Sequence, residues 1–158
     1  MAEQEDRKMG CCADKAVQLF KEGYNCSQSV FAAFADKYGI DQELALRLSA
    51  SFGGGMGRMR EVCGAVSGML LAAGLETGAV DGSDREGKAA NYKEVQTLAD
   101  LFREENGSII CRELLGLEQK DGRTPPVPEK RTEEYYKKRP CVELVRCAAE
   151  ILEKRYFA

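Results

Sequence analysis

The stretch Val62 to Leu75, VCGAVSGMLLAAGL, is the longest uncharged run in the chain. Its apolar residues cover every face of a helix instead of one stripe, and such a helix belongs in a protein core. The run is also too short to cross a bilayer, which takes about 20 apolar residues. We predict a central helix over residues 61–74, in which Gly64 and Gly68 let a neighbouring backbone approach closely.

The segments around this helix show the same helical period, and strand patterns are nearly absent. Asn25 and Asp41 are predicted N-caps, while Gly39 and Asn106-Gly107 are predicted helix stops. The predicted apolar stripes are Ala13, Ala16, Val17 and Phe20; Val30, Phe31, Phe34 and Tyr38; Leu44, Leu48 and Phe52; Tyr92, Val95, Ala99 and Phe102; and Val145, Ala148 and Leu152. With 158 residues, the chain is expected to form one domain over residues 1–158, an all-α bundle of about six to seven helices.

Residues 116–139 interrupt the helical pattern. Pro125, Pro126 and Pro128 stand among charged residues there, so we predict an irregular excursion before a last helix with Pro140 at its first position. Loops of this length are uncommon in compact domains unless they have a role. The excursion is therefore expected to cover a site or a partner surface.

The charge of the chain argues against several classes of partner. It has 23 basic and 26 acidic residues, for a net charge of −3, and they are spread along the sequence. We therefore expect no binding to nucleic acid and no membrane insertion. The first sixteen residues are highly charged and lack the apolar segment of a secretory signal, so we expect a cytoplasmic protein.

The chain has seven cysteines and no histidine. Cys26, Cys63, Cys111 and Cys141 each stand where a turn gives way to a helical pattern. A thiol in the first turn of a helix faces unpaired backbone N–H groups and the positive end of the helix dipole, which favour its thiolate. An odd number of cysteines in a reducing compartment indicates metal binding or redox chemistry, not a disulfide framework.

Helix parity predicts that these four thiols meet. If consecutive helices run antiparallel, the helices that begin at Cys26, Cys63 and Cys111 are the second, fourth and sixth, and they start at one end of the bundle. The excursion at 116–139 is long enough to bring Cys141 to the same end. We therefore predict a four-cysteine pocket.

The other three cysteines fit this pocket less well. Cys147 follows Cys141 by six residues, which in an α-helix places it about 9 Å further along the axis and about 120° around it. Both thiols cannot point into one small site. Cys11 and Cys12 are interpreted as spare thiols or helix-start residues, although the sequence leaves open whether either is a ligand.

Five blocks of sequence, in order, carry a resemblance to a known family. They are GYNCSQ at 23–28, FGGGMGR at 52–58, CGAVSG at 63–68, CRELLG at 111–116 and PC at 140–141. The chain resembles the C_GCAxxG_C_C family of redox-active proteins over nearly its whole length. The resemblance implies that Cys26, Cys63, Cys111 and Cys141 are the motif cysteines, and it implies an association with iron–sulfur clusters.

The leading hypothesis is an iron–sulfur cluster, [2Fe–2S] or [4Fe–4S], bound by Cys26, Cys63, Cys111 and Cys141 and used for electron transfer. Without histidine, a soft-metal site needs thiolates, which suits such a cluster and also Cys₄ zinc. The protein is then an electron carrier or a component of an oxidoreductase, with a redox partner protein. An all-apolar helix in so small a bundle also makes a homodimer reasonable.

Three alternatives stay open. The first is a metal-free thiol/disulfide protein, with Cys63 as the best nucleophile because a glycine-rich loop precedes it. The second is a structural Cys₄ zinc bundle that acts as a protein-binding module. The third is a small enzyme that reduces a substrate beneath residues 116–139.

The glycine-rich segment at 53–57 is followed by Arg58 and Arg60. It lacks the GxxxxGK[ST] order of a phosphate-binding loop, and no strand precedes it. We predict a tight turn beside Cys63, whose N–H groups face the site and whose arginines offset the negative charge of a cluster.

Overall fold

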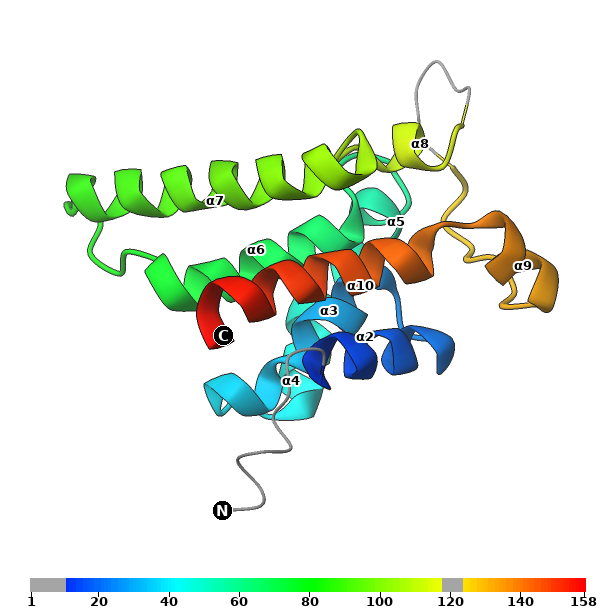
Figure 1. Cartoon of the computed structure of the whole chain (residues 1–158), viewed down its shortest axis with the longest axis horizontal. Coiled ribbons are helices and arrows are strands. Elements are labelled where there is room, and N and C mark those ends of the chain that lie inside the picture. Colours follow the sequence, from blue (N-terminus) through cyan, green and yellow to red (C-terminus); the bar gives the residue numbers. More distant parts are fainter. Residues whose placement is uncertain (1–10, 118–123) are drawn as a thin grey trace.

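The computed structural model describes residues 11–117 and 124–158, and this part of the chain is all-α, which confirms the predicted fold class (Figure 1). Within these residues, the β-type pairing is an isolated antiparallel bridge between Val62 and Ile110. The α-helices are α2 (Cys11–Lys21), α3 (Cys26–Ala33), α4 (Gln42–Ser49), α5 (Gly53–Met56), α6 (Gly64–Thr77), α7 (Arg85–Asn106), α8 (Cys111–Leu114), α9 (Glu133–Lys138) and α10 (Cys141–Leu152). Short 3₁₀ turns lie at Ala35–Tyr38 and Ala50–Phe52, and a π-helix lies at Glu153–Phe157.

Helix α6 lies at the centre, as predicted, although it begins at Gly64 instead of residue 61. Its inner residues Val66 and Met69 are fully buried. A Cβ added to Gly64 would lie 3.1 Å from Cβ of Cys26, and one added to Gly68 would lie 2.7 Å from the backbone oxygen of Ser27. The two glycines therefore let α3 approach α6 more closely than side chains would permit.

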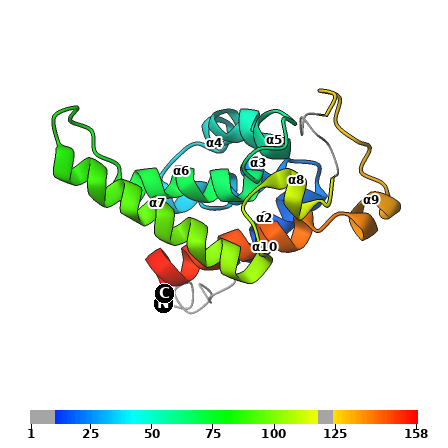
Figure 2. The same cartoon turned by 90° about the horizontal axis from the view of Figure 1, so that it is seen from above.

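The long helices run lengthwise beside one another. Figures 1 and 2 show α6 and α10 running in the same direction, with α7 running against them. Because α6 and α10 are parallel, they begin at the same end of the molecule, and α8 lies at that end too. This is the alternation that helix parity predicts.

Local sequence signals account for several helix ends. The side chain of Asn25 accepts a hydrogen bond from the Gln28 N–H, and the Gln28 side chain accepts one from the Asn25 N–H, so α3 starts with a capping box. Asp41 caps α4 through the Leu44 N–H. Gly39, with φ of 63°, ends the 3₁₀ turn at 35–38. These caps and this stop were predictable because each depends on one residue and its immediate neighbours.

The predicted apolar stripe of α4 is wrong. Leu44 and Leu48 are each 49 % exposed, whereas Ala45 and Ser49 are buried. The helix packs through its small side chains, which bring it close to α3 and turn the leucines outward. In α7 the buried residues are Leu98, Ala99 and Phe102, while Tyr92 is 60 % exposed, because the first half of α7 extends beyond the core together with the end of α6 (Figure 2).

The predicted excursion at 116–139 is not wholly irregular. It contains α9, which begins after Thr132, whose hydroxyl accepts a hydrogen bond from the Tyr135 N–H. Arg131 ties the segment to the body of the protein: it donates to the backbone oxygens of Phe20 at 2.7 Å and Tyr24 at 2.9 Å, and it stacks over the Phe20 ring at 4.0 Å. Residues 118–123 of the excursion lie outside the described residues. Pro140 is the N-cap of α10 instead of its first residue.

None of the helices in the described part of the chain combines the length and the apolar character needed to cross a membrane.

The close contact between α3 and α6 gives a stability test. Gly68→Ala should lower the free energy of unfolding by about 1–3 kcal/mol, because the new Cβ would meet the backbone oxygen of Ser27 at 2.7 Å. Gly74→Ala is the matched control, since its Cβ would have no neighbour within 4 Å and should stabilise α6 by about 0.5–1 kcal/mol. Chemical denaturation measures both, and equal stabilities for the two variants would contradict the close approach.

Candidate four-cysteine site

Four cysteines from four helix starts line one cavity of about 440 Å³. Cys26, Cys111 and Cys141 are the first residues of α3, α8 and α10, and Cys63 immediately precedes α6. Cys63, Cys111 and Cys141 are buried, and Cys26 is partly exposed. The structure thus brings together the four cysteines that helix parity had grouped.

An antiparallel backbone pairing places two of these cysteines side by side. The N–H of Cys63 donates to the backbone oxygen of Ile109 at 2.7 Å, and the N–H of Cys111 donates to that of Glu61 at 2.6 Å. The two thiols are therefore fixed by the chain itself, before any side-chain contact. Sequence reasoning missed this pairing, because a single bridge is too short to produce an alternating strand pattern.

The glycine-rich segment contains α5, whose backbone at Gly54 and Gly55 is left-handed instead of α-helical, and it forms a turn beside the cavity. Five consecutive residues from Gly54 to Arg58 have positive φ, and Arg60 follows with φ of 60°. This conformation costs an L-residue about 1–2 kcal/mol, so glycine at three of the five positions limits the strain. The turn passes so close to the site that a Cβ on Gly55 would lie 2.7 Å from Cβ of Cys111. The predicted tight turn is confirmed, but its closest approach is to Cys111 instead of Cys63.

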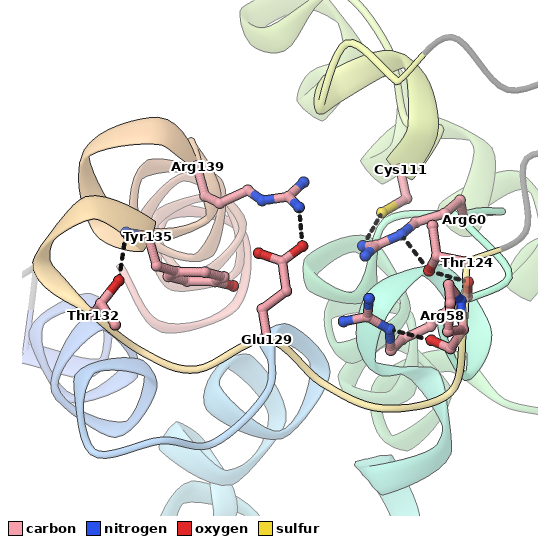
Figure 3. Close-up of polar contacts among 9 residues, drawn as sticks. Arg58, Arg60, Cys111, Thr124, Glu129, Thr132, Tyr135 and Arg139 are labelled. Atoms are coloured by element: carbon pink, nitrogen blue, oxygen red, sulfur yellow. Dashed lines mark hydrogen bonds and ion pairs between the residues drawn. The ribbon is translucent and has the colours of Figure 1, made fainter.

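Two arginines of this turn connect the cysteines with residues 124–139 (Figure 3). Arg60 is only 5 % exposed; its Nη1 donates to Sγ of Cys111 at 3.6 Å, and its Nε donates to the hydroxyl of Thr124 at 3.1 Å. Arg58 donates through Nε to the backbone oxygen of Pro125 at 2.7 Å. One short turn therefore supports a thiol on one side and the covering segment on the other.

Residues 124–139, which we call the cover, form part of the cavity wall, in agreement with the prediction that the excursion covers a site. The cover residues that line the cavity are Pro126, Pro128, Glu129, Arg131, Tyr135 and Arg139. Glu129 and Arg139 form an ion pair (Figure 3). Four arginines and one glutamate line the cavity, so its charged side chains are mainly positive.

Cys26 and Cys141 influence each other's ionisation. The Cys26 thiol donates a hydrogen bond to the sulfur of Cys141, which together with Arg139, the Tyr135 hydroxyl and Arg131 lowers the pKa of Cys141 to about 7. The same hydrogen bond, followed by burial, raises the pKa of Cys26 well above its ordinary value. The pair therefore favours one thiolate and one thiol.

At the other two cysteines, burial has the largest effect on the pKa of the thiol, and it raises that pKa. The backbone N–H groups of Ala65 and Val66 stabilise the thiolate of Cys63, as predicted, yet burial raises the pKa of Cys63 to about 12. Burial also raises the pKa of Cys111, although Arg60 opposes it. Of the four cavity thiols, Cys141 is therefore the one whose pKa is lowered, while Cys63 as the best nucleophile stays a prediction.

The remaining cysteines lie outside the cavity. Cys147 donates to Glu105 at 3.2 Å and accepts a hydrogen bond from Asn106 at 3.4 Å, in agreement with the predicted separation from Cys141. Cys12 is buried, and Cys11 is exposed at the start of α2. Neither lines the cavity.

The four thiols surround a space instead of converging on one point. Within residues 11–117 and 124–158, no three cysteine, aspartate or glutamate side chains are grouped closely enough to hold a single metal ion.

The model of one protein family, described as "Putative redox-active protein (C_GCAxxG_C_C)", matches residues 24–155. The matched region contains all four cavity cysteines and leaves out Cys11 and Cys12. No curated protein and no solved structure matches the chain.

The hydrogen bond between Cys26 and Cys141 can be tested in metal-free, reduced protein. Cys26→Ala should raise the pKa of Cys141 above about 7, because the donor that stabilises its thiolate is lost. The ultraviolet absorbance of thiolate during a pH titration measures this change. Cys147→Ala, outside the cavity, is the control, and a Cys26→Ala titration identical to that of the wild type would contradict the assignment.

The same shift predicts how the stability depends on pH. Because folding lowers the pKa of Cys141 from 9.0 to about 7, ionised Cys141 stabilises the fold above pH 9, and this contribution disappears as the pH falls through 7. The contribution of ionised Cys141 to the free energy of unfolding should be smaller in Cys26→Ala than in the wild type. Chemical denaturation at pH 7 and at pH 9 measures the difference.

Proposed function

Since the chain belongs to the C_GCAxxG_C_C family of redox-active proteins, we propose that its four-cysteine cavity holds an iron–sulfur cluster and transfers electrons. The observation that carries this proposal is that four thiols from four separate helix starts line one cavity. In a cluster the thiolates bind to more than one iron, so their sulfurs stand apart around the group. Cys26, Cys63, Cys111 and Cys141 would be the ligands of a [2Fe–2S] or [4Fe–4S] cluster.

The surroundings of the cavity fit a group with negative charge. Four thiolates bring a charge of −4, which the irons only partly offset, and Arg60 donates directly to the sulfur of Cys111. Arg131 and Arg139 lie near Cys141 and lower its pKa. Apolar residues such as Phe20 and Leu144 line the rest of the wall. Hydrogen bonds to sulfur, nearby charge and exclusion of water are the factors through which a protein sets a cluster's potential.

When bound, the cluster would supply one-electron transfer, and the chain would hold it, offset its charge and keep water away. We propose that the protein is an electron carrier or a component of an oxidoreductase, and that it exchanges electrons with a partner protein. A cytoplasmic location is part of this proposal, and it is supported by seven cysteines that are all free thiols. A homodimer is a further expectation that size-exclusion chromatography can test.

A second candidate function is supported by one specific contact. Because Cys26 donates a hydrogen bond to Cys141, these two cysteines could act without metal as a dithiol. Their oxidation would form one S–S bond and release two protons and two electrons to an acceptor. This chemistry leaves Cys63 and Cys111 without a part.

The experiment that tests the cluster is anaerobic purification followed by iron and sulfide assay and a visible spectrum. We expect iron, sulfide and a visible chromophore in the wild type. Substitution of any one of Cys26, Cys63, Cys111 or Cys141 by serine should remove most of the iron, because each thiolate is a ligand. Cys147→Ser is the matched control, since Cys147 is buried but outside the cavity, and it should keep full iron content.

The outcomes separate the candidates. Zinc without iron would indicate the structural zinc bundle. A colourless, metal-free protein in which mass spectrometry finds a Cys26–Cys141 disulfide after oxidation would indicate the dithiol. Either result would overturn the cluster, and so would a Cys63→Ser variant that retains all its iron.

A further test concerns Arg60. Arg60→Gln should make the reduction potential of the bound cluster more negative, by on the order of 50 mV, because it removes a buried cation that favours the reduced state. Arg47→Gln, on the exposed face of α4, should leave the potential unchanged. A spectroscopic redox titration measures both, and equal potentials for Arg60→Gln and the wild type would show that Arg60 does not tune the site.

A further inference from the structure

The four-cysteine cavity is large enough to hold more than the thiols and the group they bind. Its volume of about 440 Å³ falls in the range of small-ligand pockets, which is about 300–1,000 Å³. The cysteines come from the helix starts, and the left-handed turn and the cover contribute other parts of the cavity wall. These parts of the wall have their own chemistry.

Arg58 is the key polar residue in this part of the wall. Its Nε donates to the backbone oxygen of Pro125, and Figure 3 shows its two terminal nitrogens pointing away from that bond, towards the side where Glu129 lies. Within the described residues, no hydrogen bond is made by these two nitrogens. Arg58 also adopts φ of 66°, a conformation that costs energy and that proteins retain mainly at functional sites.

The environment of Arg58 is positive and partly dry. Burial is the largest cause that lowers the pKa of the Arg58 guanidinium, and the neighbouring charge of Arg60 adds to it. Arg139 acts in the same direction, whereas Glu129 and, more weakly, Tyr135 oppose it. Glu129 is already paired with Arg139. An anion at Arg58 would therefore relieve the repulsion between these arginines.

Apolar side chains line the same cavity. Leu114 and Leu115 of α8 and Pro126 and Pro128 of the cover line the cavity. A guanidinium with two unused parallel donors matches the two oxygens of a carboxylate. An apolar wall beside it matches a short hydrocarbon or aromatic body and would exclude a strongly hydrated inorganic ion.

We propose that the cavity binds a small organic carboxylate, with its carboxylate on Arg58 and its apolar part against Leu114, Leu115 and the prolines of the cover. Such a molecule would lie within the same cavity as the four thiols. The inference rests on the proposed function, because it names the class of molecule that would bind beside the redox group. Binding itself requires only the cavity, so the two proposals can fail separately.

Titration calorimetry on the full chain, reduced and under anaerobic conditions, tests the binding. The probe is benzoate, and benzamide is its neutral counterpart of nearly the same shape. We expect one benzoate per chain and at least tenfold weaker binding of benzamide, because the amide lacks the charge that pairs with Arg58. Arg58→Gln should weaken benzoate binding about tenfold, whereas Arg47→Gln, on exposed α4, should leave it unchanged.

A second variant protects the test against misfolding of the first. Leu114→Phe leaves Arg58 in place and fills part of the cavity, so it should also weaken benzoate binding. The inference is overturned if benzoate gives no binding heat at millimolar concentration, if benzamide binds equally well, or if both variants bind benzoate like the wild type.

The iron assay on the same samples keeps the two proposals apart. Protein that contains iron but does not bind benzoate would overturn the carboxylate site and leave the cluster standing. Iron-free protein that binds benzoate through Arg58 would overturn the cluster and support the carboxylate site.

Discussion

The close approach of α3 to α6 is the constraint on which the rest of the structure depends. Gly64 and Gly68 remove the Cβ atoms that would collide with Cys26 and with the backbone of Ser27. Because the contact lies at the start of both helices, it sets the thiol of α3 beside the first turn of α6. The same short distance that makes the core dense therefore also defines one side of the cysteine cavity.

Sequence reasoning recovered the features that depend on local patterns. The helices, the caps at Asn25 and Asp41 and the grouping of four cysteines follow from periodicity, single residues and chain direction. It missed features set by tertiary contact: the outward leucines of α4, the pairing of residues 61–63 with 109–111 and the helix within the cover. The relative acidity of the thiols was missed for the same reason, since burial at Cys63 is a property of the whole fold.

Inside the cavity, arginine side chains instead of water stabilise the negative charge of the thiolates. Burial alone raises the pKa of a thiol, and it does so at Cys63 and Cys111. Arginines counter it where they approach, as Arg60 does at Cys111 and as Arg139 does at Cys141. Arg60 also donates a hydrogen bond to Thr124 of the cover. Arg139 is itself a residue of the cover, in which it pairs with Glu129. The charge of the sulfurs and the position of the cover are thus physically coupled.

This charge balance serves a cluster and a dithiol equally well, because both need thiolate. The two functions differ in how many cysteines they use. A dithiol requires only Cys26 and Cys141, which already share a hydrogen bond. It gives no reason for the backbone pairing that fixes Cys63 next to Cys111, nor for a strained turn that brings Arg60 onto the Cys111 sulfur. A four-thiolate cluster gives a reason for both, and for that reason we favour it.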